Sequence, residues 1–470
     1  MLNNPLIQRY RYSVLRPSHL FIYVTIYISV VILLLFINYS IYGYQETFYV
    51  IQDLYKGLYY QFLAFEIIVL WILGGFSSAS AIKEEIMGKT YDFFRMLPLA
   101  AHQKAVGILI GKNLIVLLLG GISCLFLVLF GLLGGISINL QFQVLLTLLS
   151  ISALINTVAL LSSIRPTYQY KKTNAAIIIV AAFFFAPFIV AGLGNLSDTD
   201  KLEDVQAWFF VLRIPVLILI SLLAIHFCCW SVKGILRKFT YEDEPLFTRK
   251  GAFLFMLVVE LILLGLFYHS LEKQEIETSY SYWSISLIFA LLIPLASLRT
   301  FDRYLEHIGL IRATSGSKNI MLHLLLYSNV SLMLGLFAIW AACSLAVVSI
   351  SQIELIQQLY RIWVIFTFCM FAMLLLELYI LYKPLSRKIG YLLGFIAFVY
   401  VIFPLIINGI FDSEVLYRYS PLGFFVWIFN EPYAVVHLES IWILNVLYCA
   451  IPAFLVMNRY SHILNLRQKM

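Results

Sequence analysis

Among the ionisable side chains within long apolar runs of the sequence, three are candidates for a function, because a charge is costly there and is often kept for a function. They are Glu66, Glu260 and Arg213. Placing a charge at the centre of a bilayer costs at least about 2.5 to 3.5 kcal/mol by insertion scales. Such residues could carry a proton, line a substrate path, switch between conformations or form a structural contact between helices. The sequence leaves these roles open and predicts all three as candidate intramembrane sites.

The run GILIGKN, residues 107–113, is the closest match to a nucleotide site. A phosphate loop has four residues between its glycines and Ser or Thr after its lysine, whereas this run has three and then Asn113. We therefore expect no ATP binding by this chain. The histidines form no metal-ligand pair and all six cysteines lie in apolar runs, which predicts no metal site. No catalytic residue is predicted, and we do not expect an enzyme.

The composition is that of a membrane protein. Hydrophobic residues make up 62% and charged residues 12%, against about 25% charged residues in soluble domains. A membrane-spanning helix needs about 20 apolar residues. About twelve such runs occur, near residues 20–40, 57–81, 105–134, 139–164, 173–193, 206–231, 251–270, 281–299, 321–350, 358–382, 389–410 and 438–457. The sequence thus predicts an all-α polytopic membrane protein.

The distribution of basic residues predicts the orientation of these spans. Most of the 32 lysines and arginines fall at the N-terminus and in the even-numbered connections, and basic residues gather in cytoplasmic loops. Both termini are therefore expected in the cytoplasm. The net charge of +7 then reflects topology, and no nucleic-acid partner is expected. Residues 1–18 alternate basic and apolar side chains, which suits an amphipathic helix in the membrane interface, in contact with lipid.

Two charged stretches indicate an internal duplication. Residues 76–113 follow the second apolar run and residues 294–326 follow the eighth, at an offset of about 216 to 218 residues, and similarity at a fixed spacing is typical of repeats. The chain is predicted to form two repeated six-helix halves, residues 19–231 and 251–470. Residues 232–250 would link them in the cytoplasm.

Each charged stretch contains a short amphipathic helix by its pattern. In the first, apolar residues recur at i, i+1 and i+4, and a proline follows that suits the first turn of a helix continuing into the third span. In the second, a Ser-Gly-Ser break replaces the proline. The candidate docking residues are Asp92, Phe93, Phe94, Arg95, Leu97 and Pro98 in the first stretch, and Tyr304, Leu305, Ile308 and Arg312 in the second.

These residues resemble a known family. The run KEEIMGKTYDFFRMLPLAAHQKAVGILIGKNL, residues 83–114, is similar to the loop between helices two and three of type-2 ABC exporter permeases. The run YSPLGFF, residues 419–425, resembles the segment that these permeases place before their last helix. The resemblance extends over nearly the whole chain as six plus six spans. The second half lacks the Leu-Pro, the first half lacks an SPLG counterpart, and family members often carry six spans per chain.

The resemblance implies the transmembrane subunit of an ATP-binding-cassette exporter in a fused, duplicated form. Its two charged stretches would be coupling helices that contact two cytoplasmic ATPase subunits. ATP and Mg would bind to those partners, with no cofactor in this chain, and the substrate would be a lipid, a peptide or a drug-like molecule. The expected location is a bacterial plasma (inner) membrane. Two alternatives stay open: an ion-coupled secondary transporter, with Glu66 or Glu260 carrying the proton, and a membrane-embedded lipid or glycan transferase.

Overall fold

The computed structural model describes residues 4–42, 48–90, 96–164, 206–240, 245–273, 328–351, 355–382 and 438–466, with a few positions between 281 and 297. The chain divides into two compact units. The first comprises Met1–Ala207 and Arg213–Glu244, and the second comprises Trp208–Leu212 and Pro245–Met470. The division after Glu244 falls inside the range predicted as the linker, although helix α11 continues to Thr240 and so occupies the first part of that range.

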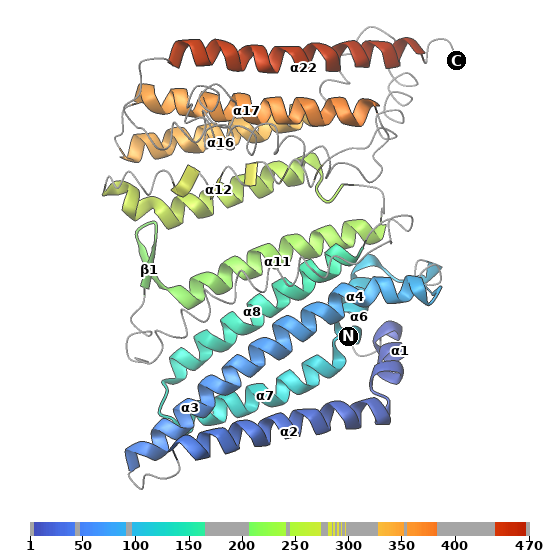
Figure 1. The fold of residues 1–470 in the computed structure, drawn as a ribbon, viewed down its shortest axis with the longest axis vertical. Coiled ribbons are helices and arrows are strands. Elements are labelled where there is room, and N and C mark those ends of the chain that lie inside the picture. Colours follow the sequence, from blue (N-terminus) through green and yellow to red (C-terminus); the bar gives the residue numbers. More distant parts are fainter. Residues whose placement is uncertain are drawn as a thin grey trace, which may run out of the picture. The chain divides into compact units, whose positions relative to one another are not determined.

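The first unit is a bundle of long helices (Figure 1). In chain order they are α1 (Pro5–Val14), α2 (Pro17–Tyr42), α3 (Phe48–Ile67), η1 (Ile68–Leu73), α4 (Gly74–Met87), α6 (Ala101–Lys112), α7 (Leu114–Leu133), α8 (Ile138–Ser163) and α11 (Val216–Thr240). Helices α8 and α11 lie side by side, α4 packs on α8, and α3 packs on α7. The short helix α1 packs on α6.

The second unit contains α12 (Arg249–Glu272), α16 (Asn329–Ser351), α17 (Leu355–Tyr382) and α22 (Leu438–Leu466). Helix α16 packs against both α12 and α17, and α17 packs against α22. The expected eighth span is helical at most of its few described positions, which include Ser281–Trp283, and Ser297 lies in a turn. The expected fifth and eleventh spans lie outside the described residues.

The protein is an all-α polytopic membrane protein. Among the described residues, seven helical segments are long and apolar enough to cross a membrane. They are Leu20–Ser40, Ile51–Met87, Leu114–Leu133, Ile138–Ser163, Val216–Thr240, Arg249–Glu272 and Asn329–Ile350. Because lipid offers no hydrogen bonds to the backbone, helices are the expected way for such apolar segments to satisfy their own amides.

The sixth span begins later than predicted. Residues 206–215, expected at its start, form a two-stranded hairpin of β1 (Gln206–Phe209) and β2 (Leu212–Pro215). Helix α11 starts at Val216, directly after Pro215. Proline has no amide to donate and stops the helix from extending backwards. The hairpin tip packs on α12, where the Phe210 amide donates to the Gly265 carbonyl at 2.7 Å.

The second span is one continuous helix with a wider turn in its middle. Segments α3, η1 and α4 follow one another without a loop, and η1 is a π-helix. A π turn holds an extra residue and leaves part of the α-helical hydrogen-bond ladder open. Here the Leu70 carbonyl accepts from Ser152 Oγ at 3.4 Å and from Asn156 Nδ2 at 3.3 Å, both on α8. Helix α8 thus supplies the donors that the π turn needs.

Candidate functional sites

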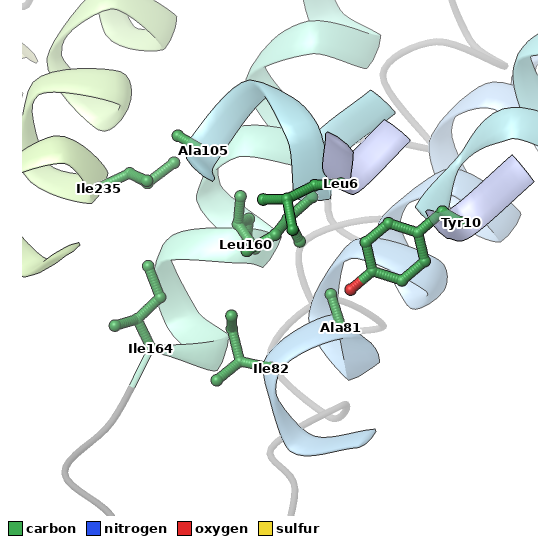
Figure 2. Close-up of a cluster of buried hydrophobic side chains, with 9 residues drawn as sticks. Leu6, Tyr10, Ala81, Ile82, Ala105, Leu160, Ile164 and Ile235 are labelled. Atoms are coloured by element: carbon green, nitrogen blue, oxygen red, sulfur yellow. The ribbon is translucent and has the colours of Figure 1, made fainter. Parts of the chain in front are cut away.

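Five helices of the first unit meet in a cluster of buried apolar side chains, which we call the five-helix cluster (Figure 2). Its members come from α1, α4, α6, the end of α8 and α11. One patch of apolar contact therefore joins helices that are far apart in the sequence. Burial of a whole aliphatic side chain contributes about 1.5 to 3 kcal/mol. The cluster contains Leu6, Tyr10, Ala81, Ile82, Ala105, Ile108, Leu160, Ile164 and Ile235.

The connection from α4 to α6 is attached to this cluster. Leu97 and Leu99 are half-buried and pack against it, while Pro98 between them is exposed. The Leu99 amide donates to the Leu97 carbonyl at 2.7 Å, which makes Pro98 the centre of a three-residue turn. The fixed φ of proline, about −65°, suits that position in an inverse γ-turn. Both leucines can therefore face the cluster on either side of the turn.

The helix after this turn starts later than predicted. Pro98 was expected in its first turn, but α6 begins at Ala101, with Ala100 as the residue before the helix. The Ala100 amide donates to the Gln103 side chain at 3.2 Å. The difference arises because the Leu97 carbonyl accepts the Leu99 amide in the tight turn at Pro98. In a helix that started at Pro98, the same carbonyl would instead accept an amide four residues later. A second break follows at Asn113, and α7 starts at Leu114.

The structure locates two of the predicted docking residues. Leu97 packs toward the five-helix cluster and Pro98 is exposed. The other eight, residues 92–95, 304, 305, 308 and 312, lie outside the described residues, so their docking role stays a prediction. Met96, which adjoins the predicted stripe, exposes 76% of its surface.

Helix α1 has the predicted amphipathic form but its apolar face contacts protein. Leu6, Ile7 and Tyr10 are buried, and Asn4 Nδ2 donates to the Gln103 carbonyl at 2.7 Å. A helix with one apolar face can cover it with lipid or with protein, and the sequence pattern is the same in both cases. Tyr12, on the opposite side, exposes 79% of its surface.

The two glycines of GILIGKN, Gly107 and Gly111, form the surface of α6 on which α1 packs. A Cβ added to Gly107 would lie 2.8 Å from the Leu6 Cβ, and one added to Gly111 would overlap the Tyr10 ring. Small residues four apart let two helices approach closely. The run is helical throughout α6 and ends with Asn113 at the break, so its glycines serve helix packing. Sequence reasoning missed this role, although the four-residue spacing was its signal.

Two neighbouring acids at the end of α4 hold α1 and α6. Glu85 is buried and accepts from Arg9 Nη2 at 2.8 Å, from Tyr10 Oη at 2.7 Å and from Thr90 Oγ1. Burial, and next the Glu85 charge, raise the pKa of Tyr10, so its hydroxyl remains a donor. Glu84 forms an ion pair with Lys112 of α6. This ion pair connects α4 to α6.

A second polar network lies further along the same span. Asn156 of α8 bonds to the Leu70 carbonyl, as described above, and its Oδ1 accepts from Ser78 Oγ at 2.9 Å. Asn113 Nδ2 donates to Ser78 Oγ at 2.7 Å. The network joins the second, third and fourth spans through their side chains.

Replacing Asn156 by leucine should destabilise the first unit by about 1 to 3 kcal/mol, because buried polar partners would lose their bonds. The Leu70 carbonyl would keep Ser152 alone, and Ser78 would lose its acceptor. Thermal unfolding of the detergent-solubilised protein measures the change. Val158→Leu places the same leucine at an exposed position on the same helix and should leave the melting temperature unchanged. An unchanged melting temperature in the Asn156 variant would contradict the network.

The predicted intramembrane acids are both buried and both take part in side-chain contacts. Glu66 accepts from Cys124 Sγ at 3.4 Å. Glu260 accepts from Tyr282 Oη at 2.5 Å and from Ser286 Oγ. In each unit a buried glutamate therefore contacts a neighbouring span. The two acids belong to different units and are separate sites.

Arg213 is not inside a span. It lies on β2 and is exposed, ahead of the first residue of α11. The prediction failed because residues 206–215 are apolar enough to resemble a helical span, while Pro215 marks the true start of the helix.

The described residues contain no group of three or more His, Cys, Asp or Glu side chains placed to hold a metal ion. Comparisons with known proteins give no match, whether to family models, to curated proteins or to solved structures.

Proposed function

We propose that this chain is the transmembrane permease subunit of an ATP-binding-cassette exporter. It would contain about twelve spans in two repeated six-helix halves, with both termini in the cytoplasm and the protein in a bacterial plasma membrane. Two separate cytoplasmic ATPase subunits would bind and hydrolyse ATP with Mg. Their motion would drive export of a lipid, peptide or drug-like substrate.

The observation that carries the proposal is the attachment of the α4–α6 connection to the five-helix cluster. A coupling element must transmit displacement from a partner to several membrane helices. Leu97 and Leu99 contact a cluster built from α1, α4, α6, α8 and α11. A close-packed interior moves between discrete arrangements and resists local deformation. A force applied to the residues before Leu97 would therefore act on the ends of these helices together.

Further support comes from pairs of residues at the duplication offset. Asn113 and Asn329 lie about 216 residues apart, each at the start of a long helix, and each donates its side-chain amide to a neighbouring helix. Asn113 bonds to Ser78, and Asn329 bonds to Glu377 at 2.8 Å. Glu66 and Tyr282 have the same offset, and both are buried. The partners lie on the second and the tenth span, which do not correspond, so these pairs support two related halves by position alone.

The proposed ATPase contact uses the apolar stripe before Leu97. Phe93 and Phe94 would insert into a groove of the partner, since large aromatic side chains commonly dominate such contacts. Leu97 belonged to the predicted stripe as well. Its packing against the five-helix cluster makes it a poor position for testing the contact, because a charge there would disturb this chain's own packing.

Replacing both Phe93 and Phe94 by aspartate should reduce recovery of the ATPase at least about tenfold, because two charges would enter an apolar groove. The tagged chain is extracted gently from its native membrane and the co-purifying ATPase is quantified. The control is Tyr12→Asp, which adds a charge at an exposed aromatic residue on α1. The control should retain the partner.

The paired change Leu305→Asp and Ile308→Asp should cause a smaller loss, because the second stretch lacks the Leu-Pro turn. Two outcomes would overturn the proposal. One is a wild-type chain that recovers no ATPase from gently extracted membranes and whose transport a protonophore abolishes. The other is full recovery of the ATPase with the Phe93 and Phe94 double variant.

A further inference from the structure

Glu66 is buried with less hydrogen bonding than an ionised carboxylate requires. Its exposed fraction is 0%. Oε1 accepts from the Cys124 thiol at 3.4 Å, and a thiol is a weak donor. The Ser123 hydroxyl, which also bonds to Tyr27, is a further donor near the carboxyl group. Within the described part of the chain, Oε2 has no hydrogen-bond partner. The carboxyl group lies against the backbone of α7, since a Cβ added to Gly120 would be 2.9 Å from Oε1.

Among the described residues, the elements packed around Glu66 bring no positive charge to it. By sequence, η1 and α8 contain no titratable side chain, and α7 contains Cys124 alone. Helix α2 contributes Tyr27, whose hydroxyl bonds to Ser123 Oγ at 3.0 Å. On its own helix the nearest basic residue is Lys56, ten positions earlier, which is about 15 Å along the axis.

The other buried acids of the described residues are better compensated. Glu85 has the Arg9 guanidinium and the Tyr10 hydroxyl. Both oxygens of Glu260 accept from hydroxyl groups, and Glu377 accepts from Asn329 and from a tyrosine. Leaving an uncompensated ion buried costs several kcal/mol even after relaxation. Taking up a proton removes that cost, and Glu66 is the residue for which the gain is greatest.

We propose that Glu66 is a proton-binding site within the first unit, and that its proton keeps α3 packed closely on α7. With the proton bound, the carboxyl group is neutral and fits against Gly120. Without the proton, the carboxylate would draw water or a cation into the contact between α3 and α7. The site is independent of any ATPase partner.

Infrared difference spectroscopy of the full-length protein in liposomes tests the site. The spectrum of Glu66→Gln is subtracted from that of the wild type at pH 7. Glutamine has nearly the same size and keeps the helix contact. The expected difference is the C=O stretch of a protonated carboxyl group, which should decline as the pH is raised. Carboxylate bands at pH 7 in place of that stretch would overturn the proposal.

A second measurement uses the wild-type protein alone. Dicyclohexylcarbodiimide enters the bilayer and reacts with protonated acids: the acid gives its proton to a carbodiimide nitrogen, its oxygen bonds to the central carbon, and rearrangement leaves a stable acylurea. At pH 7, peptide mass spectrometry should find Glu66 labelled at least about tenfold more than Glu84, whose charge is held by Lys112. Equal labelling of the two acids would count against the proton.

Discussion

Replacing Gly111 by leucine should detach α1 from α6. The added side chain would occupy the space of the Tyr10 ring, which already overlaps the position of a Cβ on Gly111. Overpacking a filled contact costs about 1 to 3 kcal/mol, and a whole leucine side chain belongs at the upper end. Hydrogen exchange of the amides of residues 5–14, followed by mass spectrometry, should show at least about a hundredfold loss of protection.

The matched control for this experiment is Gly121→Leu. Gly121 also lies in a helix of the same unit, but a Cβ there would meet nothing within 4 Å. The control should leave the exchange of α1 unchanged and should keep the melting temperature of the protein. Continued protection of α1 in the Gly111 variant would mean that Tyr10 does not occupy the position described.

Replacing Glu85 by alanine should destabilise the same end of the first unit by about 3 kcal/mol. Three donors would lose a buried acceptor, and a hydrogen bond to a charged group contributes about 1.5 to 3 kcal/mol. The total stays well below the sum because 38% of the Arg9 side chain is exposed and can turn to water. Thermal unfolding in detergent measures the loss.

Glu85→Gln provides a graded comparison. The amide oxygen can still accept from Tyr10, while the charge opposite Arg9 is lost. We expect about half of the destabilisation of the alanine variant. If alanine and glutamine have equal effects, the charge of Glu85 matters and the Tyr10 bond does not. If neither variant changes the melting temperature, Glu85 does not hold α1.

Hydropathy predicted the bounds of a membrane helix well where the whole helix is a continuous apolar run. The expected spans near 20–40, 139–164 and 251–270 correspond to α2, α8 and α12 within a few residues. It failed at residues 206–215, because apolar side chains suit a hairpin and a helix equally. There Pro215 was the informative residue. Hydropathy also gave no sign of η1, because a π turn and an α turn place similar demands on apolar side chains.

The partners of individual side chains could not be read from one sequence. The alternation of basic and apolar residues identified α1 as amphipathic. Its contact with α6 depends on Gly107 and Gly111, which lie about a hundred residues later in the sequence. The position of Glu66 and Glu260 inside long apolar runs identified them as unusual, and the structure confirms that both side chains are buried. It could not identify Cys124, Tyr282 or Ser286 as their neighbours, because those contacts depend on how the spans pack.

The π turn has a further consequence for the second span. Glu85 lies nineteen positions after Glu66, and in an unbroken α-helix this spacing would leave them about 100° apart around the axis. The wider turn of η1 absorbs about one residue, which brings the two acids onto the same side. Glu66 contacts α7, and Glu85 contacts Tyr10 on the surface of α6. The span thus behaves as a helix with a one-residue insertion, and deleting one residue from η1 would leave a regular α-helix in which Glu66 and Glu85 still lie on the same side.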